Sequence, residues 1–280
     1  MVQKSSDSDR HRNLVGFNGK TCYVLLTDHY SGRLFGRAFD SKAPPVDWLN
    51  SWLANNAPPC TNKYVRMDGG GELGKCREIP RTFTNFGYSV ELTGPDSSHQ
   101  NGPGERPHQT IGDAMRAMLS GAHLRPNFWP YAFYHYLCLY NFVPHGDRSS
   151  SPFEMCGAPL PNLSRFRTFG CRDYIRPTTS RSGWVVPNSR TGVFLGYSRT
   201  LKVMNNYNLD SAMVKTATHA RLDKGMNDLT EPPPNACLLR HLANRDAINP
   251  DTLDVPPLSL EVSDDPFERL DNHTQSIVFA

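Results

Sequence analysis

The sequence lacks the features that would assign it to a membrane or to a secretory pathway. It has no run of about eighteen apolar residues, the length that a helix needs to cross a bilayer. Its opening segment, MVQKSSDSDRHRN, has no apolar core of the kind found in signal peptides. We therefore expect no membrane association, and a location in the nucleus or the cytoplasm.

The sequence also lacks a cysteine pattern. Its seven cysteines are odd in number and scattered, with no C-x-x-C pair and no histidine partner at zinc spacing. Cysteines of this kind are typical of small buried hydrophobic side chains. Neither a disulfide framework nor a zinc centre is expected.

The net charge of +3 hides an asymmetry along the chain. Residues 231–280 hold three basic and nine acidic residues, a charge of −6, and residues 1–230 hold 27 basic and 18 acidic, a charge of +9. A basic body favours a polyanionic partner, because phosphate neutralisation supplies most sequence-independent affinity for nucleic acids. A merely soluble surface is the alternative. Residues 226–280, with EPPPN, NPD, VPP and DDP, indicate a flexible acidic tail.

The hydrophobic pattern predicts an α/β body followed by a β-rich module. Residues 21–28 and 33–40 form a predicted hairpin across HYSG, and Pro44 and Pro45 precede a helix. The strand KYVRM ends at Asp68, and GYSVELT is the next strand. Helices are expected at about 108–121 and 126–142. From about Arg165 the pattern changes to short strands separated by Gly, Pro and Ser.

Two carboxylates stand in distinctive surroundings. Asp68 closes a strand and opens the turn DGGGE, and Glu105 lies within PDSSHQNGPGERPHQTI. Acidic side chains that converge from separate elements can hold two magnesium ions for phosphoryl transfer. The separation alone is weak evidence, because the chain has 27 acidic residues. The motifs around the two residues are more specific.

These motifs resemble the integrase core of copia-type retrotransposons, which carries D-N-G-G-E and P-x-x-P-Q-x-N-G-V-x-E-R-x-N-R-T-I. The likeness continues in order through AMRAMLSGAHLRPNFWPYA and SPFEMCGAP. The family pattern LRxFGCxAYV…GVFLGYS is matched by RFRTFGCRDYI and GVFLGYS, and GFNGKTCYVLLTDHYSGR resembles an upstream hairpin. The resemblance covers about residues 15–225.

The resemblance implies a ribonuclease-H-like core at 15–145, a mixed sheet flanked by helices, with an SH3-like β-barrel at 160–225. Residues 1–14 would be disordered or a degenerate first strand. Asp68 and Glu105 would bind Mg²⁺ (or Mn²⁺) for 3′-end processing and strand transfer. The implied partner is DNA, with a possible homo-oligomer. The candidate DNA-binding residues are Arg106, Arg116, Arg165, Arg167, Arg172 and Arg176.

The chain departs from the family pattern at its first acidic residue. The strand that should carry it falls at about residues 5–13, SSDSDRHRN, which contain no apolar residue. Asp7 is nearest the required place and Asp9 is second, yet neither is followed by the family's Gly-Pro. Asp28 matches another acidic position, where capping of a turn is favoured over metal binding.

Further departures lie close to Glu105. Pro107 removes a backbone donor and clashes with the preceding turn unless the helix begins at about residue 106. Gln109 stands where the family has arginine, and the family's His-His-Cys-Cys zinc module is absent from the sequence. We therefore expect little or no catalytic activity. The alternative function is a non-catalytic nucleic-acid-binding or scaffold protein that retains the fold.

Overall fold

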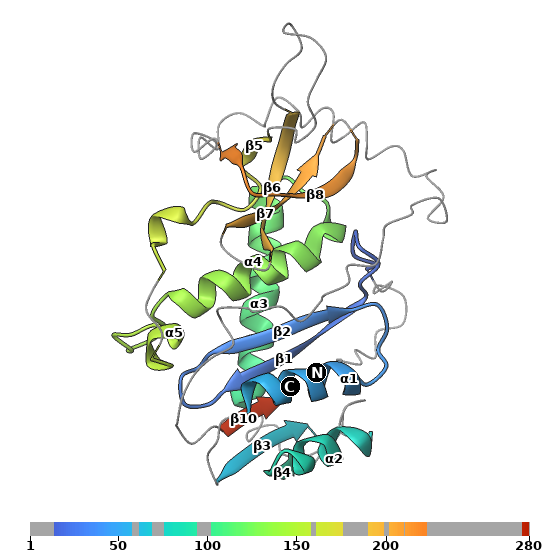
Figure 1. Cartoon of the computed structure of the whole chain (residues 1–280), viewed down its shortest axis with the longest axis vertical. Helices are drawn as coiled ribbons and strands as arrows, with labels where there is room; N and C mark the ends of the chain where they lie inside the picture. The colour runs from blue at the N-terminus through green and yellow to red at the C-terminus, as the bar shows by residue number, and fades with distance from the viewer. Residues whose placement is uncertain are drawn as a thin grey trace, which may run out of the picture. The chain divides into compact units, whose positions relative to one another are not determined.

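The computed structural model describes residues 14–57, 62–68, 76–93, 102–157, 161–175, 190–198, 202–209, 211–222 and 276–279, with the backbone alone at 68, 93, 102–105 and 276–279 (Figure 1). These residues fall into two compact units. The first unit holds the described residues up to Met115, residues 136–163 and the strand at 276–279. The second holds residues 116–135 and the described residues from Ser164 to Leu222.

The first unit is built on a mixed five-stranded sheet in the order β2-β1-β10-β3-β4 (Figure 1). Its strands are β1 (Cys22–Asp28), β2 (Leu34–Phe39), β3 (Lys63–Asp68), β4 (Tyr88–Thr93) and β10 (Ser276–Phe279). β1 is antiparallel to β2 and β10, whereas β10, β3 and β4 are parallel to one another. The predicted hairpin between residues 21 and 40 is confirmed.

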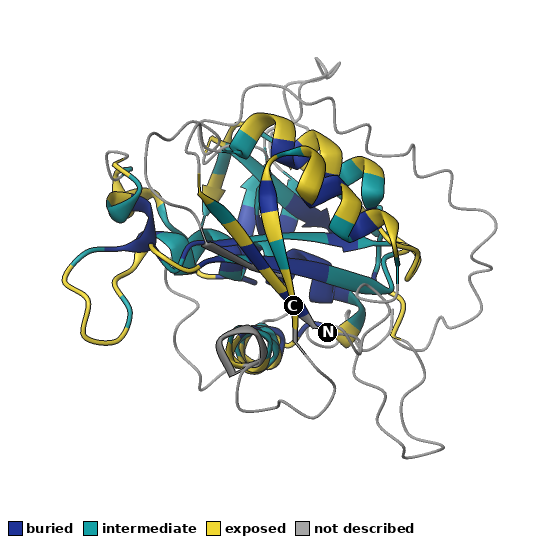
Figure 2. Ribbon diagram, turned by 90° about the horizontal axis from the view of Figure 1, so that it is seen from below, coloured by how far each residue is buried: buried dark blue, intermediate teal, exposed yellow. Residues whose placement is uncertain are grey.

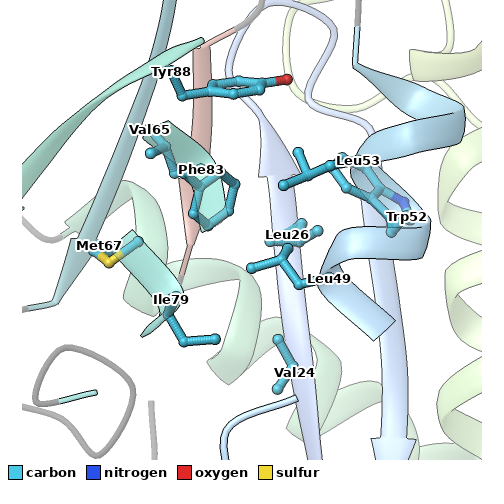
Figure 3. Close-up of a cluster of buried hydrophobic side chains, with 10 residues drawn as sticks. All are labelled: Val24, Leu26, Leu49, Trp52, Leu53, Val65, Met67, Ile79, Phe83 and Tyr88. Carbon is cyan, nitrogen blue, oxygen red and sulfur yellow. The ribbon is translucent and has the colours of Figure 1, made fainter. Parts of the chain in front are cut away.

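Two helices supply the core on one side of this sheet. In α1 (Val46–Asn56), the residues Leu49, Trp52 and Leu53 are buried on one face, as the helical spacing predicts. α2 (Glu78–Asn85) buries Ile79 and Phe83 four residues apart. Figure 3 shows these side chains pointing toward those of β1 and β3 in one cluster. The strand members of the cluster are Val24, Leu26, Val65, Met67 and Tyr88.

Other residues of the unit pack elsewhere on the sheet. Tyr23 alternates with Val24 along β1 and therefore faces the other side of the sheet. Its ring stacks on His108 at a centroid distance of 5.4 Å. Asn141 holds β2 by two hydrogen bonds, because its Oδ1 accepts from Leu34 N (2.9 Å) and its Nδ2 donates to Leu34 O (2.8 Å). In Figure 2 the buried residues gather on the strands and on the helix sides that face them.

Of the two long helices after β4, the first begins earlier than the sequence predicts and the second begins later. α3 spans Gly102–Gly121 and so begins before the expected residue 108. A 3₁₀ turn at Pro126–Phe128 precedes α4 (Trp129–Phe142). The short helix α5 (Pro152–Met155) begins at a capping box, in which Ser151 and Glu154 satisfy each other's backbone N–H groups. A second 3₁₀ turn lies at Leu163–Arg165.

The second unit carries an antiparallel five-stranded sheet in the order β8-β7-β6-β5-β9. The strands are β5 (Arg172–Ile175), β6 (Arg190–Ser198), β7 (Val203–Asn208), β8 (Met213–Ala217) and β9 (Ala220–Leu222). Short strands after Arg165 agree with the sequence pattern. The described pairings run from β8 to β9 without joining them, so closure into an SH3-like barrel stays a prediction.

Helical residues 116–135 belong to this second unit, although the sequence assigned them to the core domain. The reason is their packing. The ring of Phe128 meets that of Tyr207 edge to face at 5.1 Å. Gly170, at φ +81°, lies so close to Ala122 that an added Cβ would collide with it.

The expected exclusion of the acidic tail from the fold is wrong for residues 276–279. Ser276–Phe279 form β10, which pairs with β1 and β3 in the middle of the sheet. The physical reason is that these four residues, SIVF, are unlike the polar tail before them and have high β propensity. The rest of the tail, and the first strand expected at residues 5–13, lie outside the described residues. Among the described helices, none is long and apolar enough to span a membrane.

Candidate functional site

The two predicted metal ligands lie on separate elements of the first unit. Asp68 is the last residue of β3 and is in register with Thr93, the last residue of β4. Glu105 is the fourth residue of α3 and therefore belongs to its first turn. The carboxyl ends of parallel strands share one edge of a sheet, so Asp68 stands at that edge. The side chains of Asp68 and Glu105 lie outside the described residues, so their proximity stays a prediction, as does the role of Asp7.

Asp28 caps a turn, as the sequence analysis favoured. Its Oδ2 accepts hydrogen bonds from the backbone N–H (3.1 Å) and the hydroxyl of Ser31 in the β1–β2 hairpin. Through β10, the antiparallel register places Asp28 level with Val65. Val65 lies three residues before Asp68, a distance of roughly 10 Å along a strand. Asp28 therefore stands away from the edge that carries Asp68.

Pro107 does not prevent helix formation before it. It is the sixth residue of α3, so the helix begins at Gly102 and not at about residue 106. His108, next to it, lies against Tyr23, with His108 Nδ1 3.2 Å from the Tyr23 hydroxyl oxygen. This histidine therefore packs against the sheet. Burial raises the pKa of Tyr23 to about 12.

The described arginines of the predicted DNA-binding set are not alike in their surroundings. Arg106, Arg116 and Arg165 are exposed, whereas Arg167 and Arg172 are half-buried. The guanidinium of Arg167 is used locally, because its Nη1 donates to Ser164 O (2.5 Å) and to Phe166 O (2.8 Å). The exposed arginines are therefore better candidates for phosphate contacts than Arg167. Arg176 lies outside the described residues.

The aromatic residues of NFWPY, at the end of the motif AMRAMLSGAHLRPNFWPYA, are core residues. Phe128, Trp129 and Tyr131 are all buried. Burial raises the pKa of Tyr131 to about 12. A stacking platform for bases needs exposed ring faces, so these three side chains do not form one.

Two buried titratable groups of the second unit were not predicted from the sequence. Asp173, on β5, is fully buried, and its burial raises the pKa of the carboxyl to about 7. Its Oδ1 has no hydrogen-bond partner among the described residues. Oδ2 accepts from Asn206 when the Asn206 amide is oriented with its nitrogen toward the carboxylate. In the family pattern FGCxAYV this position carries alanine, and that difference is the signal that could have identified it.

His135, on α4, is the second of these groups. Its ring lies among those of Phe169, Phe194 and Tyr197, at centroid distances of 5.6, 5.7 and 5.8 Å. Burial lowers its pKa to about 4, so the ring is neutral at physiological pH. It serves as an aromatic core residue of the second unit. A single histidine in an aromatic helix gives no sequence signal of such burial.

Within the part of the chain that the structure describes, no group of three or more His, Cys, Asp and Glu residues could hold a metal ion. The side chains of Asp68 and Glu105 are not part of that description. The ligand set for Mg²⁺ therefore stays a prediction from the motifs.

The comparisons with known proteins identify relatives among transposon polyproteins, although no family model matches the chain. The retrovirus-related Pol polyproteins of transposons RE1 and RE2 from Arabidopsis thaliana are 32% and 28% identical over 207 residues, 72% of this chain. That of transposon TNT 1-94 from Nicotiana tabacum is 29% identical over 136 residues, 48% of this chain. The chain spans only 14%, 14% and 10% of these relatives.

Among solved structures, the catalytic core domain of BIV integrase matches 48% of this chain and 83% of its own length, with a TM-score of 0.36 and 15% identity. The motifs quoted above and the sequence matches to the plant polyproteins agree, and both extend over most of the chain. The chain is thus a homologue of the retrovirus-related Pol polyproteins of copia-type transposons.

Proposed function

We propose that this chain is an integrase-derived protein that binds DNA through its basic body and performs no strand transfer. The observation that carries the proposal is the homology to retrovirus-related Pol polyproteins over 207 residues. The first unit would be a ribonuclease-H-like core and the second an SH3-like module. Asp68 and Glu105 would be what remains of a site for Mg²⁺ or Mn²⁺.

The ancestral chemistry would be polynucleotidyl transfer. Asp68 and Glu105 would hold divalent metal ions, which would supply activation of the attacking oxygen and stabilisation of the leaving oxygen in a displacement at phosphorus. Such a site needs a complete set of hard oxygen ligands from separate elements. The helix dipole at the first turn of α3 would favour the ionised form of Glu105.

One observation favours the non-catalytic function. The strand between β1 and β3 is Ser276–Phe279, and its sequence SIVF contains no carboxylate. With Asp68 and Glu105 alone, the site would lack a ligand. The charge of +9 on residues 1–230 still supplies the electrostatic contribution to DNA binding. Homo-oligomerisation and a location in the nucleus or the cytoplasm are further parts of this proposal.

The expected result is weak, salt-sensitive DNA binding without chemistry. Binding to a DNA duplex that ends in the terminal sequence of the transposon should have a Kd of about 10⁻⁴ to 10⁻⁶ M at physiological salt. The affinity should fall steeply as the salt concentration rises. A mobility-shift assay measures binding, and the 3′-end joining of a labelled strand measures transfer with Mg²⁺ or Mn²⁺. The combined changes Arg106→Gln, Arg116→Gln and Arg165→Gln should lower the salt slope by up to about three.

A matched control is Arg81→Gln, which removes an exposed arginine of α2 outside the predicted set. It should leave the salt slope close to that of the parent chain. Joined products that depend on metal and disappear in Asp68→Asn would overturn the inactive assignment. A mobility shift that is absent, or that does not change with salt, would overturn the binding assignment.

A further inference from the structure

The strand β10 has neighbours on both sides. Leu26, Thr27 and Asp28 of β1 pair with Phe279, Val278 and Ile277 in antiparallel register. On the other side, residues 64–67 of β3 pair with residues 276–279 in parallel register. A segment from far along the chain thus occupies the central position of the sheet (Figure 1).

No other described strand holds β1 and β3 together. The second edge of β1 is taken by β2, with six residue pairs, and the second edge of β3 by β4, also with six. Leu26 and Val65, which border the central position, are fully buried. Backbone N–H and C=O groups at such places need hydrogen-bond partners, because water cannot replace them. The sheet therefore requires a strand between β1 and β3.

The segment before β1 is the alternative candidate for the strand between β1 and β3. The turn between Gly16 and Lys20 leads directly into β1, with Gly16 N donating to Lys20 O (2.6 Å). A hairpin partner upstream of that turn would run antiparallel to β1, and β2 already holds one edge. It could pair only where β10 lies. Residues 5–13, SSDSDRHRN, have no apolar side chain to bury there, whereas SIVF has three.

From this topology we propose that the space between β1 and β3 is an acceptor groove for one extended apolar strand, and that Ser276–Phe279 of the same chain is its occupant. The groove takes a short strand that runs parallel to β3. Its occupation completes the backbone pairing of the sheet in the first unit. Because SIVF contains no carboxylate, the strand brings no acidic ligand to this place. That consequence rests on the proposed function, whereas the assignment of the strand rests on the sheet pairing alone.

Hydrogen exchange on the full chain tests the assignment directly. The backbone amides of residues 277–279 should exchange at least about 100-fold more slowly than an unstructured peptide, as should those of Leu26 and Val65. Rapid exchange at residues 277–279, with Leu26 and Val65 still protected, would overturn the proposal. The measurement does not depend on DNA binding, so its failure is distinct from failure of the proposed function.

A proline in the strand gives a second test. Val278→Pro removes a backbone donor from a strand that is paired on both sides, and it should lower the melting midpoint by about 6–12 °C. The control, Thr252→Pro, adds the same residue to the tail outside any described strand. Equal midpoints for the two variants would contradict the assignment.

Rescue in trans identifies the groove as a binding site. A synthetic peptide of residues 272–280, added to the full chain that carries Val278→Pro, should restore the melting midpoint and the protection of Val65. The same peptide with Val278→Pro should not. Failure of the unmodified peptide to restore either quantity would overturn the acceptor groove. A parent chain that forms a dimer only while residues 271–280 are present would overturn the intramolecular occupant in favour of a second copy.

Discussion

Asp173 is a residue whose burial has a measurable cost. The folded protein keeps its carboxyl protonated up to about pH 7, whereas the ordinary pKa of the group is 3.8. Folding therefore takes up a proton between these values. The contribution of Asp173 to the free energy of unfolding is greatest below about pH 4, falls as the pH rises and reaches its low value above about pH 7. The total loss is at most about 4 kcal/mol.

The change Asp173→Asn keeps the shape of the side chain and removes its titration. We expect the variant to be more stable than the parent by about 2–4 kcal/mol near pH 8, with the difference close to zero near pH 4. Urea unfolding at several pH values measures this. The control is Asp40→Asn, which changes an exposed carboxylate of the first unit. A parent and variant that differ by the same amount at every pH would show that Asp173 is ionised in the folded protein.

Asp28 and Asp173 also show what one residue's sequence context can predict. Asp28 precedes Ser31 and Gly32 in a hairpin turn, and Gly32 adopts a φ of +74°. A local turn of this kind predicts a capping role from a few neighbouring residues. Asp173 lies in a strand of ordinary sequence, and its burial depends on strands far away along the chain. The alanine that the family pattern carries at this position marks Asp173 as unusual, but the raised pKa itself depends on those distant strands.

At the scale of elements, α3 carries an internal proline. Pro107 has no backbone N–H, so the carbonyl of Pro103, four residues earlier, loses its helical donor. The sequence predicts this conflict, which a helix start at about residue 106 would avoid. In the structure the helix extends to Gly102 and includes the proline.

Replacing this proline should stabilise the helix start. We expect Pro107→Ala to raise the free energy of unfolding by about 1–3 kcal/mol, since alanine restores the donor and removes the ring clash. Thermal unfolding followed by circular dichroism measures the gain. The control is Pro152→Ala at the start of α5, where proline is favourable because that N–H has no helical partner. A loss of stability in Pro107→Ala would contradict the expected strain.

At the scale of the whole molecule, two segments of the chain have net charges of opposite sign. Residues 231–280 have a net charge of −6 and residues 1–230 have +9. The acidic residues of the tail compete with DNA phosphates for the same lysine and arginine side chains, and salt screens this competition. The tail should therefore weaken DNA binding most at low ionic strength.

Neutralising part of the tail tests this charge effect. A chain with Asp251, Asp254, Asp264 and Asp265 changed to Asn should bind duplex DNA several-fold more tightly at about 50 mM salt and nearly equally at about 200 mM. Fluorescence anisotropy across this salt range measures the difference. The control changes Asn235 and Asn249 to Gln, which leaves the charge unaltered. Equal affinity of parent and neutralised chains at low salt would show that the tail charge has no part in binding.

The sequence by itself determined the local secondary structure of this protein and was enough to recognise its relatives. The hairpin at 21–40, the apolar faces of α1 and α2 and the capping role of Asp28 follow from periods of two and 3.6 residues and from turn residues close in sequence. The motifs from Gly16 to Ser198 predicted the relationship to copia-type Pol polyproteins, and the sequence matches confirm it.

Only the tertiary structure decided which segment completes the first sheet, and which polar groups are buried. A strand pairs with whatever edge is left open, so the place of Ser276–Phe279 between β1 and β3 depends on strands more than two hundred residues away. In the same way, residues 116–135 join the second unit because of contacts with distant strands. Local sequence patterns carry no record of such long-range pairing, because its free energy arises only when the separate elements meet.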